Sequence, residues 1–89
     1  PPLEAVTGNL ERATPRVLVI NGRTLPVNQG TRMLPPDHPL GSQNLYQLSQ
    51  AEIRSLPPYK SRRFRSVVKV RVRERQGMAL VVQPLEIVR

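Results

Sequence analysis

The sequence predicts a small, mainly β domain that is built from two β-hairpins. Two β-rich runs, residues 16–27 and 68–82, are each interrupted by a turn dipeptide, Asn21-Gly22 in the first and Gln76-Gly77 in the second. Only one segment, near residues 49–56, carries a clear helix signal, and residues 28–42 form a long proline-rich connection. The hairpins would make a single curved sheet or an open barrel, and a small α+β arrangement is the alternative.

The length and composition indicate one domain with a thin core. A chain of 89 residues buries only roughly 60–65% of its unfolded surface. Its three aromatic residues, Tyr46, Tyr59 and Phe64, supply little bulk, and ten prolines favour irregular connections. We therefore assign residues 16–89 to a single β-rich domain. Residues 1–15 are assigned to an N-terminal arm, because Thr7-Gly8-Asn9 interrupts the helical spacing of the apolar residues around it.

The first hairpin has the stronger turn signal. Asn-Gly accepts positive φ at both central positions, which a type I′ turn requires. That two-residue turn places Ile20 opposite Arg23 and Leu18 opposite Leu25, so the two leucines share a face. Pro26 cannot donate to a ladder, so the second strand is expected at an edge of the sheet or to end there.

The helix is predicted from its start signal. Ser49 and Glu52 form a capping box, and Leu48 and Ile53 occupy the two positions of a hydrophobic staple. The helix must be short because Pro57 forces Leu56 out of the α region. The preceding connection, residues 28–42, is unusually long for so small a domain unless a partner holds it.

The second hairpin allows two registers. A two-residue turn at Gln76-Gly77 would place charged side chains opposite apolar ones on a common face. We favour a three-residue loop over residues 75–77, which pairs Val72 with Leu80. This register predicts one apolar face (Val68, Val70, Val72, Leu80, Val82) and one face that carries Lys69, Arg71 and Arg73. Residues 85–88 are expected to continue as a last strand.

Catalytic and metal-binding residue types are scarce. The chain has one His, one Asp and no Cys, and His38 lies beside Asp37 in an irregular segment. Neighbours in sequence usually point in different directions, so these two residues do not make a catalytic dyad by adjacency. The glycines do not cluster into a phosphate-binding loop. We therefore expect no enzyme activity, no cofactor and no metal site.

The strongest functional signal is an uneven distribution of charge. Residues 60–75 hold eight basic residues against one acid, Glu74, and so carry +7 of the chain's formal +8. Basic residues on one face of a strand lie ~6.6 Å apart and form a row of cations, which favours polyanions. A solvated strand face is the plainer interpretation. The candidate polyanion-binding residues are Lys60, Arg62, Arg63, Arg65, Lys69, Arg71, Arg73 and Arg75.

Two functional hypotheses follow. The first is a non-catalytic structural or accessory subunit of a larger assembly, such as a virion or a ribonucleoprotein, that docks other protein subunits through extended arms and the basic strand face. The second is an autonomous module that binds DNA or RNA without sequence preference through the same residues. No apolar run approaches the ~20 residues of a membrane span, and the amino terminus lacks an apolar signal core. We therefore expect no membrane partner and a location in the cytoplasm or within a particle.

Overall fold

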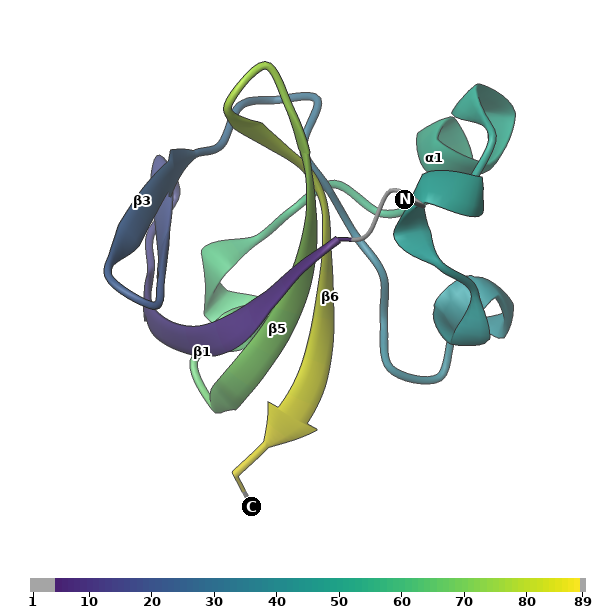
Figure 1. Cartoon of the computed structure of the whole chain (residues 1–89). Coiled ribbons are helices and arrows are strands. Elements are labelled where there is room, and N and C mark those ends of the chain that lie inside the picture. Colours follow the sequence, from purple (N-terminus) through teal and green to yellow (C-terminus); the bar gives the residue numbers. More distant parts are fainter. Residues whose placement is uncertain (1–4, 89) are drawn as a thin grey trace.

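The computed structural model describes residues 5–88 and has a six-stranded sheet as its main element (Figure 1). The strand order is β3-β2-β1-β5-β6-β4, and every neighbouring pair is antiparallel except β4 and β6. The mainly β fold with one short helix is thus confirmed. The strands are β1 (Val6–Ala13), β2 (Val17–Ile20), β3 (Arg23–Pro26), β4 (Arg32–Met33), β5 (Val67–Arg75) and β6 (Met78–Ile87). The helical elements are η1 (Pro39–Ser42), η2 (Leu45–Gln47), α1 (Gln50–Ser55) and η3 (Ser61–Phe64).

The sheet is strongly curved, so that its inner face encloses the main core (Figure 1). The edge strand β3 approaches the other half of the sheet, and Nη2 of Arg23 lies 2.8 Å from Oε1 of Glu74 on β5. This salt bridge links β3 to β5 across the open side of the curved sheet. The buried residues of the core are Leu18, Ile20, Leu25, Met33, Phe64, Val67, Val70, Val72, Ala79 and Val82.

The first hairpin has the predicted turn and register. Asn21 and Gly22 have φ of +50° and +78°, and Ile20 pairs with Arg23 and Leu18 with Leu25. Both leucines are buried in the core. As Pro26 indicated, β3 lies at an edge of the sheet.

Part of the predicted N-terminal arm is a strand. β1 lies between β2 and β5 rather than apart from the domain, whereas residues 1–4 of the predicted arm lie outside the described residues. Gly8 explains the difference, because a Cβ at this position would lie 2.8 Å from Cγ2 of Ile20. The missing side chain lets the strand pack closely on the hairpin, where the Asn21 side chain accepts a hydrogen bond of 3.0 Å from the Asn9 N–H. The interruption of helical spacing at Gly8 therefore marks a close strand contact.

The favoured register of the second hairpin is wrong. Gln76 and Gly77 have φ of +54° and +80° and form a two-residue turn, with Arg75 opposite Met78. An irregularity at Leu80 then shifts the pairing by one residue, so that Val72 lies opposite Val82. This bulge keeps Val70, Val72 and Val82 on the inner face as predicted. Leu80 was assigned to the same face, but it packs instead against buried residues on the outer face. Val68 was assigned to that face but is 38% exposed, because a second irregularity places Val67 inward instead.

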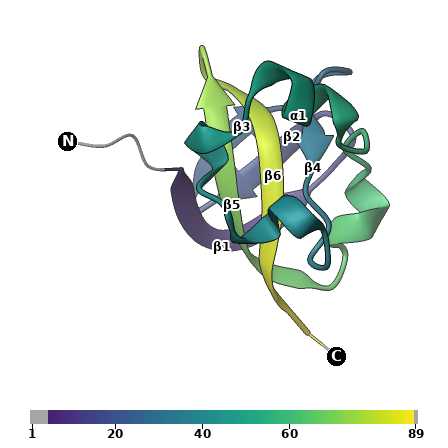
Figure 2. The same cartoon turned by 90° about the vertical axis from the view of Figure 1, so that its right-hand side faces the viewer.

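The connection and the helix pack on the outer face of the sheet (Figure 2). Leu34 donates a backbone hydrogen bond of 2.9 Å to Val82, and Met33 donates one of 3.0 Å to Pro57. α1 begins with the predicted capping box, in which the Ser49 N–H donates to Glu52 Oε1 at 2.8 Å and the Glu52 N–H to Ser49 Oγ at 3.1 Å. A second cluster of buried residues results, comprising Leu34, Leu45, Leu48, Ile53, Leu56 and Val81. The outer face of β6 is therefore covered by protein.

Candidate interaction surface

The eight basic residues proposed from the sequence do not lie in one exposed row. Those on β5 (Lys69, Arg71, Arg73) are half-buried, whereas those before it (Lys60, Arg62, Arg63, Arg65) are exposed. Arg75 is exposed at the hairpin turn, at the far end of the nine-residue strand β5. At ~3.3 Å per residue, this end lies roughly 26 Å from the start of the strand.

Arg73 is bound within the protein. Its Nη1 donates hydrogen bonds to the carbonyl oxygens of Leu45 at 3.0 Å and Leu48 at 3.3 Å. The guanidinium carbon also lies 5.0 Å from the centre of the Tyr46 ring, a cation–π distance. The side chain thus holds the turn η2 against β5, and its donors are already used in part.

Arg71 takes part in a similar contact with the covering segment. Its Nη1 lies 3.4 Å from Oε1 of Gln83, which is the opposite residue on β6. Gln83 is buried, and its Nε2 donates to the carbonyl oxygen of Gly41. On the basic face of β5, Arg73 therefore contacts residues 45–48 directly and Arg71 reaches Gly41 through Gln83.

The exposed cations gather around the short turn η3. Phe64 is the buried residue of this turn, and its ring lies 5.4 Å from the ring of Tyr59. The Tyr59 hydroxyl donates a hydrogen bond of 3.0 Å to the carbonyl oxygen of Thr14. With Phe64 turned into the core, Lys60, Arg62, Arg63 and Arg65 are left in solvent.

Arg12 joins this group from β1. It is exposed and lines the same shallow hollow as Phe64 and Arg65. The sequence did not indicate Arg12, because only the packing of β1 beside η3 brings it there. We call Arg12, Lys60, Arg62, Arg63 and Arg65 the η3 surface.

The η3 surface is not neutralised by the described acids. Within residues 5–88 the structure has one salt bridge, and it joins Arg23 to Glu74 elsewhere. Glu11 lines the same hollow as Arg12, and its carboxylate accepts a hydrogen bond from the Gly22 N–H. It offsets at most one of the five positive charges, so most of the charge of the η3 surface is available to a partner.

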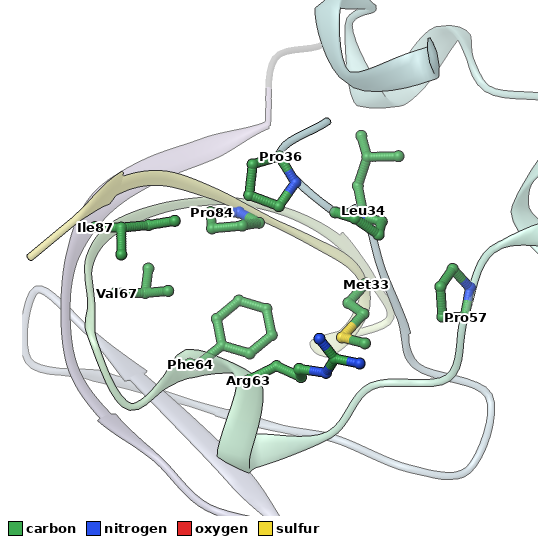
Figure 3. A pocket seen from close by; sticks show the side chains of 10 residues that line it. Met33, Leu34, Pro36, Pro57, Arg63, Phe64, Val67, Pro84 and Ile87 are labelled. Carbon is green, nitrogen blue, oxygen red and sulfur yellow. The ribbon is translucent and has the colours of Figure 1, made fainter. Parts of the chain in front are cut away.

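An apolar hollow lies next to the η3 surface (Figure 3). Its volume is about 230 Å³. The end of β6 at its edge exposes Leu85 and Ile87, and the chain continues with Val88, which is 61% exposed. The hollow is lined by Met33, Leu34, Pro35, Pro36, Pro57, Arg63, Phe64, Val67, Pro84 and Ile87.

The remaining polar side chains serve the fold. His38 Nδ1 accepts a hydrogen bond of 3.2 Å from the Leu40 N–H and so caps η1. Residues 5–88 contain no group of three His, Cys, Asp or Glu side chains that could hold a metal ion. No helix in this part of the chain is long and apolar enough to cross a membrane.

Burial gives Tyr59 an unusual titration, which leads to a prediction. Desolvation raises its pKa from 10.0 to about 12. Between these values the unfolded chain loses the phenol proton while the folded chain keeps it, so stability conferred by Tyr59 is full below pH 10 and is lost as the pH rises towards 12. Urea unfolding can be measured from about pH 8 to pH 12, a range that spans both pKa values. The difference in unfolding free energy between wild type and Tyr59→Phe should become smaller above pH 10. Parallel curves would show that the phenol is solvated in the folded state.

Comparison of the chain with known protein families, with curated proteins and with solved structures finds no match.

Proposed function

We propose that this chain is a non-catalytic subunit of a larger assembly and docks an acidic protein surface through the η3 surface. The observation that supports this proposal is a group of exposed cations without described salt-bridge partners, placed directly beside an apolar hollow. Protein interfaces combine an apolar centre with a polar rim and are enriched in Arg over Lys. The η3 surface has that composition, with Lys60 as its single lysine.

The docking elements differ from those that the sequence suggested. In the predicted arm, Val6–Asn9 pairs with β5 and Leu10–Ala13 pairs with β2. On the predicted basic strand face, Arg73 contacts Leu45 and Leu48, and Arg71 reaches Gly41 through Gln83. The η3 surface and the nearby end of β6 replace them in the proposal. The proposed assembly is a virion or a ribonucleoprotein, and the proposed location is the cytoplasm or the particle itself.

Binding of nucleic acid remains the second candidate because four arginines lie in the η3 surface, and Arg can grip phosphate in a bidentate manner. The arrangement favours it less. A sequence-independent binder usually lines a groove with cations and stacks bases on exposed aromatic rings. Here Phe64 is buried, and Tyr46 lies beneath Arg73.

Sedimentation of an extract from the native source, with and without nuclease, tests the proposal. We expect the chain to sediment well above its own 10.1 kDa, and nuclease to leave this unchanged. Arg62→Glu with Arg65→Glu should release it, because the reversed charges would repel an acidic partner. The matched control is Arg54→Glu with Arg75→Glu, which changes the net charge equally at exposed sites away from η3.

Three outcomes would contradict the proposal. The chain could sediment as a free monomer, or both pairs of substitutions could behave alike, and either result would remove the assembly role of the η3 surface. Release by nuclease would instead favour the nucleic-acid candidate, in which each phosphate contact contributes about 0.9 to the slope of log K against log salt.

A further inference from the structure

We propose that the apolar hollow binds one large apolar side chain of an acidic protein segment, and that flanking carboxylates of this segment lie on the η3 surface. This inference rests on the proposed function and specifies the chemistry of the partner. It would make the hollow the centre of the interface and the cations its rim.

The hollow has the size and depth of a side-chain pocket. Its walls include Met33, Phe64 and Val67, which are buried, while Ile87 at the end of β6 is 47% exposed (Figure 3). A volume of about 230 Å³ exceeds the ~150 Å³ of an apolar protein cavity that admits benzene. It is smaller than the ~300 Å³ at which pockets for whole small-molecule ligands begin. One phenylalanine or leucine side chain suits this space.

The wall favours an apolar occupant over a nucleotide base. Four lining residues are prolines (Pro35, Pro36, Pro57, Pro84), and a proline has no backbone N–H to donate. Nine of the ten lining side chains are apolar, Arg63 being the exception. A base buried there would leave most of its polar edge without partners, which is unfavourable. A hydrocarbon side chain has no polar groups that burial would leave without hydrogen-bond partners.

The charges around the hollow indicate what flanks that side chain. Arg63 lines the hollow itself, and Arg62 precedes it in η3. Arg12 and Arg65 line a neighbouring hollow that shares Phe64 and Val67 with it. Pro36 and Ile87 line the hollow across from Arg63 (Figure 3), and each has an exposed acid as its chain neighbour, Asp37 and Glu86. Carboxylates of a bound segment are therefore attracted to the η3 side and repelled from the other. This asymmetry also gives the segment a preferred direction.

Two synthetic peptides test the inference on the purified chain by fluorescence anisotropy. Both have eight residues and the same charge from four glutamates, and they differ only in a central phenylalanine or serine. We expect the phenylalanine peptide to bind more tightly by roughly tenfold or more, since it buries a large apolar side chain. Ile87→Asp should abolish this preference, and Ile87→Ser should weaken it without adding a charge.

Matched variants separate the hollow from the cations. Val68→Asp places the same charge at a residue that is exposed but does not line the hollow, so it should keep the preference. Arg63→Glu should weaken both peptides, whereas Arg54→Glu, on the exposed side of α1, should weaken neither. Circular dichroism of each variant confirms that it is folded.

Several results would overturn the inference. They are equal binding of both peptides, absence of binding by either, or a preference that survives Ile87→Asp. If the chain bound phosphatidylserine vesicles and Ile87→Asp abolished this binding, the hollow would be assigned to a lipid surface. If polyuridylate displaced the peptide, the cations would be assigned to nucleic acid. If the chain self-associated and Ile87→Asp abolished this, the occupant would be a second copy of the chain. If the peptides fail but the chain still sediments in its assembly, the hollow is wrong and the proposed function stands.

Discussion

Replacing Arg73 by methionine is expected to lower the free energy of unfolding by about 2–4 kcal/mol. Methionine replaces the aliphatic stem of arginine but has no guanidinium and therefore no donors. The carbonyl oxygen of Leu48 would then lose this donor in a partly buried site, at a cost of ~1–3 kcal/mol. The carbonyl oxygen of Leu45 would lose its 3.0 Å bond from Arg73 but keep the 3.4 Å bond from the Leu48 N–H. Loss of the cation–π contact with Tyr46 adds about 0.5–1 kcal/mol.

Urea denaturation measures this change, and Arg75→Met is the matched control. Arg75 lies on the same strand and is exposed at the turn, so its replacement should change stability by no more than about 0.5 kcal/mol. Arg73→Lys should fall between the two, because a lysine keeps the charge but lacks the planar arrangement of donors. If Arg73→Met matched Arg75→Met, the row of cations on β5 would be a solvated face after all.

Sequence reasoning succeeded where the signal lies within a few neighbouring residues. The Asn21-Gly22 turn, the Ser49 cap and the end of the helix before Pro57 are set by interactions among residues a few positions apart. Such signals are complete in the sequence itself. Each of these features has the predicted geometry in the structure.

The sequence could not show contacts that depend on distant segments. Alternation along β5 indicated one apolar and one basic face, but covering of the basic face depends on residues 41–48, which fold back over it. The bulge at Leu80 could not be predicted from the alternating pattern either. It shifts the pairing of β5 and β6 by one residue but leaves Val70, Val72 and Val82 on the inner face. Nor does any local signal place β1 beside η3, where it contributes Arg12.

Replacing Phe64 by alanine is expected to lower the free energy of unfolding by about 3–5 kcal/mol, the usual cost of removing a buried aromatic ring. Phe64 is 3% exposed and packs against Tyr59 and the main core. An 89-residue domain has a stability of only roughly 4–13 kcal/mol, so the loss is a large fraction of the total. Val68→Ala, a truncation at the surface of β5, should cost about 0.5 kcal/mol or less.

The local effect of Phe64→Ala separates the role of η3 from that of the core. Ser61–Phe64 has Phe64 as its buried residue and the hydrogen bond from Arg63 N–H to Lys60 at 3.0 Å within the turn. Without the ring, η3 should open before the sheet does, and amide exchange in residues 61–65 should accelerate more than exchange in β5 and β6. Uniform acceleration along the chain would contradict this, because it would show that η3 unfolds only together with the sheet.

The same variant predicts which part of binding depends on the geometry of η3. Phe64→Ala leaves every cation of the η3 surface in the chain but removes the ring that positions them and forms a wall of the apolar hollow. In conditions where the variant remains folded, weak salt-dependent attraction to the glutamate peptides should therefore persist, because it requires only charge. The preference for the phenylalanine peptide should disappear, because it requires a formed hollow. If the preference for the phenylalanine peptide were retained, the apolar contact would lie elsewhere on the molecule. If the attraction to both peptides were also lost, the cations of the η3 surface would bind glutamates only when Phe64 holds them in position.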